Sequence, residues 1–278
     1  MIIDTHAHLN FDVFDKDRKK VIERCHKNKV WVVNVGINFE TSKKAVEIAE
    51  KYEGMFASVG LHPLNLDAGL VKIKNKKEGT EKTFNYQKYK ELAKSPKVIA
   101  IGEIGLDYYL KPKTKKKKEI FKAKQKELLF EELKLAKKLN LPVIFHCRMA
   151  HFDLIQFLKE NKGVFPKKAV IHSFVGKLEE LKEYLSFGYN IGFNGIIFKK
   201  VEGVDFKKII KVVPLEKILV ETDAPYLVPP QIKEKRNEPI FVKYVIKRIA
   251  EIKNLEFEKI AEITSKNAKR LFRIKSKL

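Results

Sequence analysis

Two histidines stand two residues apart near the start of the chain, in MIIDTHAHLN. In a β-strand, side chains at positions i and i+2 point to the same face, so His6 and His8 would converge on one spot beside Asp4. Neutral imidazole is a metal ligand, and a convergent pair is a candidate half of a metal site. A hydrogen-bonded polar strand end explains the same residues equally well, because a short motif is only a hypothesis. The rest of the chain has to decide between these two interpretations.

Short apolar runs alternate with helical segments along the whole chain. The runs are MIID at the start, then Val30–Ile37, Met55–Pro63, Lys97–Gly105, Leu141–Cys147, Lys168–Phe174, Tyr189–Gly195 and Lys217–Pro225. Such runs, bounded by Gly, Pro or polar residues, are typical of buried parallel strands. Segments between them, such as Thr41–Tyr52 and Lys124–Asn140, repeat apolar residues at three- and four-residue spacing and predict amphipathic helices. Eight such alternations in 278 residues predict an α/β fold, a single (β/α)8 TIM barrel that makes residues 1–278 one domain.

Polar residues that could do chemistry gather at the ends of these runs, where barrel enzymes carry their active sites. They are His6 and His8, His62, Glu103, His146, His172, Asn194 and Asp223. Their nitrogen and oxygen donors suit Zn, Mn, Fe or similar ions, and five imidazoles would be a costly way to finish an apolar core. Six of them are the candidate metal ligands: His6, His8, Glu103, His146, His172 and Asp223. Six ligands exceed the needs of one tetrahedral zinc, which favours two divalent metal cations bridged by a shared carboxylate.

The chain is strongly basic. It has 58 Lys and Arg against 35 Asp and Glu, a formal charge of +23, and a pI near 9.7. Such a charge attracts polyanions, and nucleic acid, most plausibly DNA, is the expected partner. The lysines gather at Lys74–Lys77, Lys111–Lys118, Phe198–Lys200 and the C-terminal tail. Since a lysine-rich surface is also an ordinary solvated surface, the charge supports nucleic-acid binding only weakly.

The cysteines and the lack of a targeting or membrane segment bear on the cellular compartment. Cys25 and Cys147 form no metal-type or redox-type pair, and no stretch is a signal peptide or long enough to span a membrane, so we expect a cytoplasmic protein.

Two segments interrupt the alternation of strands and helices: a lysine-rich insertion at Gly69–Tyr89 and the loop Pro229–Pro239. Both follow strands on the catalytic face, so both are candidates to touch substrate, although loop variability explains the insertion as well.

Seven stretches carry a resemblance to a known family: DTHAHL, VGLHP, IGEIGLDYY, FHCR, IHSF, ETDAPYL and KRNEP, with TSKNAKRLF near the end. In this order and over nearly the whole chain they resemble the TatD family of metal-dependent deoxyribonucleases, in the amidohydrolase-like barrel superfamily. The resemblance implies divalent-metal-dependent hydrolysis of DNA phosphodiesters, typically from a 3′ end. It assigns His6, His8 and Asp223 to one metal and His146 and His172 to the other, bridged by Glu103. Two positions depart from the family pattern: Leu64 stands where many relatives have a second histidine, and IHSFVG differs from the family's commoner sequence after the sixth strand. Neither departure changes a proposed ligand.

Catalytic roles follow from the same chemistry. Asp223 is the expected proton acceptor for the attacking water, with Glu103 as the second catalytic carboxylate. Arg148, two residues after His146, is expected to bind phosphate through its planar guanidinium, against the alternative of a rim salt bridge. His62 is expected to bind phosphate or protonate the leaving oxygen, against the alternative of a hydrogen-bonded turn residue.

Two other functions remain open at this stage. A hydrolase of the same fold would act on an amide, a lactone or a small phosphate ester, since fold does not fix function. A non-catalytic nucleic-acid-binding protein is disfavoured, because it has no need of six converging donors. The sequence leaves open the metal, among Mg, Mn, Zn, Ni and Fe, and the choice between DNA and RNA and between exonuclease and endonuclease.

Overall fold

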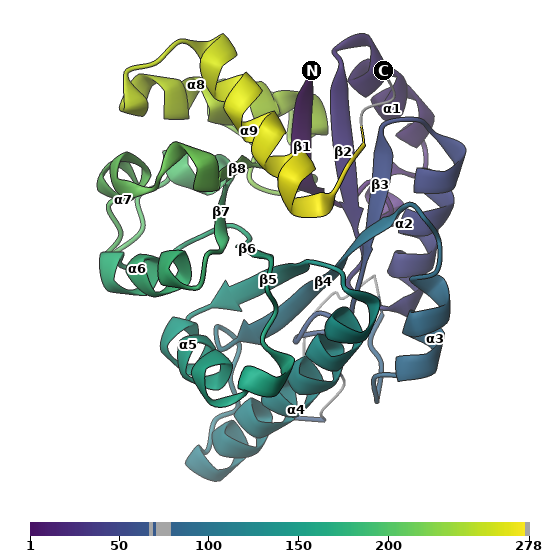
Figure 1. The fold of residues 1–278 in the computed structure, drawn as a ribbon. Helices are drawn as coiled ribbons and strands as arrows, with labels where there is room; N and C mark the ends of the chain where they lie inside the picture. The colour runs from purple at the N-terminus through teal and green to yellow at the C-terminus, as the bar shows by residue number, and fades with distance from the viewer. Residues whose placement is uncertain (67–68, 71–78, 276–278) are drawn as a thin grey trace.

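Eight parallel strands form the centre of the computed structural model, which describes residues 1–66, 69–70 and 79–275 (Figure 1). They are β1 (Ile2–Ala7), β2 (Val30–Val35), β3 (Met55–Val59), β4 (Val98–Asp107), β5 (Val143–Arg148), β6 (Ala169–Ile171), β7 (Asn190–Phe193) and β8 (Ile218–Val220). Each strand pairs in parallel with the next one in chain order, from β1 through to β8. The eight predicted strands and the (β/α)8 barrel are therefore confirmed.

Side-chain and backbone hydrogen bonds join β8 to β1 and bring the sheet nearly to closure. The backbone N of Asp223 donates to the carbonyl of His6 (2.8 Å), and the N of His8 donates to the carbonyl of Ala224 (2.7 Å). Asp4 is fully buried, and its carboxylate accepts from the backbone N (2.9 Å) and the hydroxyl (2.5 Å) of Thr222. Asp4, expected beside the two histidines, thus uses both of its oxygens to hold the last loop against the first strand.

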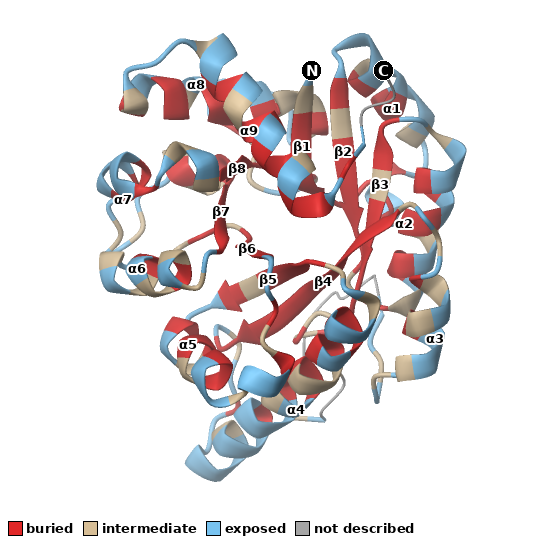
Figure 2. Ribbon diagram, in the orientation of Figure 1, coloured by how far each residue is buried: buried red, intermediate tan, exposed pale blue. Residues whose placement is uncertain are grey.

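Helices follow the strands and surround them, with their inner faces buried and their outer faces exposed (Figure 2). They are α1 (Arg18–Lys27), α2 (Phe39–Lys51), α3 (Tyr86–Leu92), α4 (Lys115–Leu139), α5 (His151–Glu160), α6 (Leu178–Ser186), α7 (Phe206–Val212), α8 (Val242–Lys253) and α9 (Phe257–Phe272). Short 3₁₀ turns are η1 (Asp12–Phe14), η2 (Lys162–Val164), η3 (Gly195–Phe198), η4 (Leu215–Lys217) and η5 (Pro239–Phe241). No helix among the described residues is both long and apolar enough to cross a membrane.

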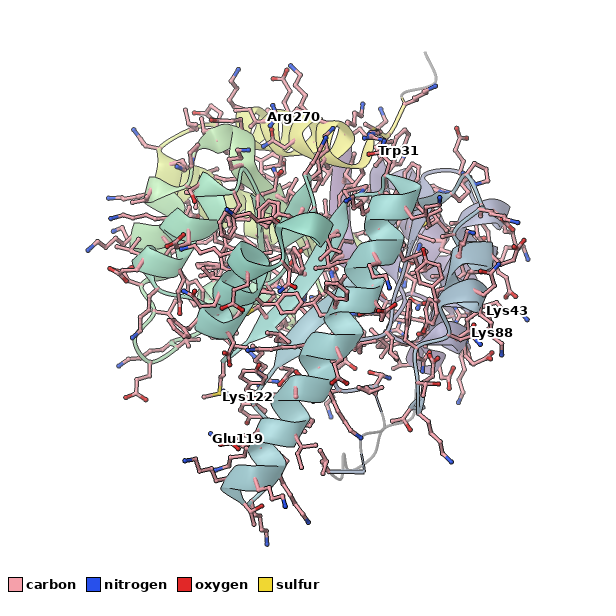
Figure 3. The ribbon with its side chains drawn as sticks, turned by 60° about the horizontal axis from the view of Figure 1, so that its bottom comes forward. Trp31, Lys43, Lys88, Glu119, Lys122 and Arg270 are labelled. Carbon is pink, nitrogen blue, oxygen red and sulfur yellow. The ribbon has the colours of Figure 1, made fainter. Side chains whose placement is uncertain are left out.

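Helix α4 is longer than the predicted segment Lys124–Asn140, since it begins at Lys115. The hydroxyl of Thr114 caps it by accepting from the N of Lys117 (3.3 Å), and the lysines that follow are good helix formers. Figure 3 shows Glu119 and Lys122 on the end of α4 that extends past the barrel, with Trp31 and Arg270 at the opposite end of the molecule.

The structure describes the two segments that interrupt the strand–helix alternation, Gly69–Tyr89 and Pro229–Pro239, to different extents. Residues 71–78 of the insertion, which include Lys74–Lys77, lie outside the described residues, as do the last three residues of the chain. The described end of the insertion runs into the first turn of α3. The loop Pro229–Pro239 packs inward at its C-terminal end. Arg236 pairs with Asp17 (2.6 Å), and the side-chain amide of Asn237 donates to the carbonyls of Thr222 and Tyr226. Most of residues 230–235 are exposed. That this loop touches substrate stays a prediction.

Candidate metal centre

The six predicted ligands meet at the carboxyl end of the barrel. A cavity of about 1310 Å³ opens there, and His8, Glu103, His146, His172 and Asp223 line it, while His6 lies fully buried beneath. Because the carboxyl ends of parallel barrel strands face one another, residues distant in sequence converge at this point.

The first group of donors surrounds Nε2 of His6. This atom lies 3.3 Å from Nε2 of His8 and 3.3 Å from Oε2 of Glu103. Asp223 completes the group, with Oδ1 3.4 Å from Nε2 of His8. Ligand atoms around a tetrahedral zinc, with bonds of about 2.0–2.1 Å, stand roughly 3.3 Å apart. These separations therefore fit one small divalent ion.

The second group uses the other oxygen of the same glutamate. Oε1 of Glu103 lies 2.6 Å from Nδ1 of His146 and 3.7 Å from Nε2 of His172. Oδ1 of Asp223 is 3.9 Å from Nε2 of His172, so it stands between the two groups. Glu103 thus presents one oxygen to each histidine set.

Polar contacts on the outer side of three histidines indicate which nitrogen faces the centre. Nδ1 of His8 lies 2.8 Å from the carbonyl of Val35, which can only accept, so this nitrogen carries the proton. Nδ1 of His172 lies 2.7 Å from a carboxylate oxygen of Glu221, and Nε2 of His146 lies 2.9 Å from one of Asp107. In each ring the nitrogen that faces the centre can then offer a lone pair, as metal-binding histidines do. The donor set and its supports fit a bound metal.

Glu221 and Asp107 are the functional carboxylates that the sequence reasoning missed. Glu221 is buried and also accepts from the backbone N of Ser173 (2.7 Å) and the side-chain amide of Asn194 (3.1 Å). Both acids lie inside stretches already singled out, ETDAPYL and IGLDYY. The signal that could have found them is the rule that a metal-binding histidine donates its second N–H to a carboxylate or carbonyl.

Close backbone approach brings β4 against β5. A Cβ on Gly105 would lie 1.9 Å from the carbonyl O of His146, and one on Gly102 would lie 2.6 Å from Cβ of Ile144. Only glycine fits at these two positions, so Glu103 between them can reach the centre. Asp223 sits in the left-handed region with φ +58°, a conformation that Asp tolerates better than most residues.

Electrostatics at the centre favour a charged glutamate. Burial would raise the pKa of Glu103, but the surrounding histidines, led by His6 and His172, hold it well below its usual value. Burial would likewise lower the pKa of His146, but Asp107 and Glu103 raise it to about 9. The pKa of His172 rises to about 10, because Glu221 and Glu103 outweigh burial. The carboxylates therefore make a negatively charged centre that attracts cations.

The two predicted substrate contacts lie in the same cavity. Nδ1 of His62 accepts from the N of Leu64 (3.1 Å), which leaves the proton of the neutral ring on Nε2, 3.8 Å from Oε1 of Glu103. Arg148 is exposed, and its guanidinium lies over the ring of Tyr109, 3.6 Å from the centroid. Among the described residues no carboxylate pairs with Arg148, so the alternative of a rim salt bridge is not what the structure shows.

Comparisons with known proteins show the family of this chain. The model of the family described as TatD related DNase matches residues 3–273. An uncharacterized metal-dependent hydrolase, YabD of Bacillus subtilis (strain 168), is 40% identical over 99% of this chain and 100% of its own length. The 3′-5′ ssDNA/RNA exonuclease TatD of Escherichia coli (strain K12) is 31% identical over 98% of this chain and 99% of its own. The crystal structure of YjjV, a TatD homologue from Escherichia coli K12, superposes with a TM-score of 0.82, at 28% identity over 99% of this chain and 98% of that one.

Proposed function

The chain belongs to the TatD-related DNase family of metal-dependent hydrolases, and from that premise we propose that it is a nuclease. It hydrolyses DNA phosphodiester bonds from the 3′ end, using two divalent metal cations. Relatives about 31% identical carry the name 3′-5′ ssDNA/RNA exonuclease, which supports both the nucleic-acid substrate and the polarity. The basic charge of +23 supports a polyanionic substrate.

One observation carries the proposal: the position of Glu103 between two donor groups. Its Oε2 faces His6 and His8, at 3.3 and 3.9 Å, while its Oε1 faces His146 and His172, at 2.6 and 3.7 Å. A carboxylate with one oxygen toward each histidine pair would help to hold one metal ion on either side, and the four histidines would supply nitrogen ligands. Bound there, the ions would neutralise phosphate charge and lower the pKa of a water molecule at the site.

Asp223 is the proposed proton acceptor for that water. Its carboxylate lies at the cavity wall, between His8 and His172 at 3.4 and 3.9 Å. Burial would raise its pKa, but the facing imidazoles of His8, His172 and His6 hold it below its usual value. It is therefore charged at neutral pH and can accept a proton.

His62 and Arg148 are the proposed contacts to the scissile phosphate. His62 presents an N–H at Nε2, and it can donate to a phosphate oxygen or pass its proton to the leaving 3′ oxygen. The Arg148 guanidinium lies over the ring of Tyr109, with no carboxylate partner among the described residues, and can offer a phosphate two N–H donors. An amide or a lactone carries no negative charge for such a group to bind, which favours the phosphodiester over those substrates.

The experiment strips the protein with a chelator, adds Mg, Mn or Zn separately, and supplies single-stranded DNA labelled at its 5′ end. Wild type should shorten the strand stepwise from its 3′ end only when a metal is added. Glu103→Gln should lose at least 1000-fold in rate, whereas the exposed control Glu119→Gln should match wild type. If no metal restores cleavage, the proposal fails, and screening moves to amides, lactones and small phosphate esters.

A cytoplasmic location is proposed from cysteine usage alone. Cys25 and Cys147 are both buried free thiols, and burial raises the pKa of each. Reducing compartments keep such thiols unpaired. Fractionation of cells that produce the tagged chain tests this location, and recovery outside the cytoplasmic fraction would contradict it.

A further inference from the structure

Large apolar side chains are exposed around the mouth of the cavity. Phe152 is 72% exposed, Met149 66%, Tyr109 53% and Tyr226 51%, and all four line the cavity. Among the described residues these are four of the five most exposed large hydrophobic side chains, the other being Val13 at 52%. Exposed apolar groups gathered at one place mark a binding surface, whereas single ones scattered over a protein need no explanation.

The order of the strands places these residues on opposite sides of the mouth. Tyr109 is the second residue after β4, Met149 is the first residue after β5, and Phe152 lies in the first turn of α5. Tyr226 follows β8, which the ring order places across the barrel from β4 and β5. The metal ligands lie between the two sides, so an occupant of the cavity meets an apolar or aromatic surface on either side of the reacting group.

We propose that Met149 and Phe152, opposite Tyr226, form a subsite that binds an unpaired nucleobase beside the scissile phosphodiester. The inference rests on the proposed nuclease function and adds how the substrate is held. Every base has a flat apolar face that stacks on aromatic and thioether side chains without regard to sequence. A base inside a duplex is covered by its neighbours on both faces, so the subsite takes only an unpaired one.

The charged side chains at the mouth of the cavity also fit a nucleotide. Arg148 lies on Tyr109 next to Met149, so a cation for the phosphate stands beside an apolar surface for the base. Lys122 and Asp153 also line the cavity but pair with each other, at 3.0 Å. A nucleotide, with its alternating anionic and flat apolar groups, matches that arrangement.

The test compares two single-stranded DNA substrates of equal length. One carries thymine throughout, and the other has tetrahydrofuran residues, which lack both base and aldehyde, at its last three 3′ positions, so the phosphodiester chemistry is the same. Wild type should show a KM at least tenfold lower for the thymine strand. The variant Met149→Ala with Phe152→Ala should lose that preference through a raised KM for the thymine strand, with kcat and the KM for the other strand unchanged. Val13→Ala, which changes another exposed apolar side chain outside the cavity lining, should keep the preference.

Two results would overturn the subsite: equal KM values for both strands in wild type, or an unchanged preference in the double variant. A lack of the proposed nuclease activity can be told apart from both of these results. If wild type cleaves neither strand, fluorescence anisotropy with the same labelled strands and the metal-loaded protein measures the same preference as a Kd ratio. A ratio of at least tenfold that the double variant abolishes supports the subsite even then, and a ratio near one refutes it.

Discussion

Replacing Glu221 by Gln removes a negative charge that faces His172 while leaving an acceptor oxygen in its place. In the native structure the two side chains are buried and 2.7 Å apart, and Glu221 also accepts from Ser173 and Asn194. A carboxylate behind a metal-binding histidine makes the ring a stronger ligand, and its loss lowers metal affinity about 10- to 100-fold. The reduction is expected at the ion that His172 binds and not at the ion that His6 and His8 bind.

The pH of the measurement changes the size of this effect. Glu221, together with Glu103 and Asp223, outweighs burial and raises the pKa of His172 to about 10, so below that pH a proton competes with the metal for the ring. Each pH unit below the pKa costs about tenfold in metal affinity, or roughly 1.4 kcal/mol. Without the Glu221 charge the pKa of His172 is lower, so a proton competes less with the metal for the ring in the Gln variant. At pH 7 this offsets part of the loss in metal affinity. The loss in affinity should therefore be larger at pH 9 than at pH 7.

Titration calorimetry with Mn, after chelator treatment, measures both quantities. Wild type should bind two ions, and the affinity for the second should rise with pH between 7 and 9 as fewer protons are displaced. Glu221→Gln should keep one strong site and weaken the other, while the exposed Glu119→Gln matches wild type. Two sites of native affinity in Glu221→Gln at pH 9 would refute the assigned role of this carboxylate.

Three further substitutions test other parts of the account. His62→Ala should lower kcat by about 100-fold or more with both ions still bound, since His62 supplies a proton and no lone pair; loss of an ion in metal titration would make it a ligand instead. Arg148→Ala should raise KM for single-stranded DNA about tenfold and leave metal binding unchanged, and an unaltered KM would dismiss the phosphate contact. Asp4→Ala should lower the free energy of unfolding, measured with urea, by about 1–3 kcal/mol, because Thr222 and His6 lose their buried acceptor; native stability would contradict its role in joining β8 to β1.

Much of the fold and of the donor set could be predicted from the sequence, for a physical reason. Strand runs alternate with helical periodicity, and a parallel barrel brings every strand end to one face. His6, His8, Glu103, His146 and His172 could therefore be placed together before any contact was known. The structure brings them within 2.6–3.9 Å of a neighbouring donor.

The features that could not be predicted depend on contacts between neighbouring elements. The pairing of Glu221 with His172 and of Asp107 with His146 requires the relative register of strands, which periodicity does not contain. The loop Pro229–Pro239 follows a strand, as substrate loops do, yet Asn237 turns inward to carbonyl groups of the loop after β8. The exposure of the Phe152 side chain could not be predicted from the sequence, because phenylalanine is usually buried.

Anomalous diffraction from crystals grown with Mn would show whether two metal ions share Glu103. We expect two anomalous peaks about 3.5–4 Å apart, one on the side of His6 and His8 and the other on the side of His146 and His172, each within bonding distance of a different oxygen of Glu103. A single peak, or two peaks of which neither contacts Glu103, would contradict this expectation.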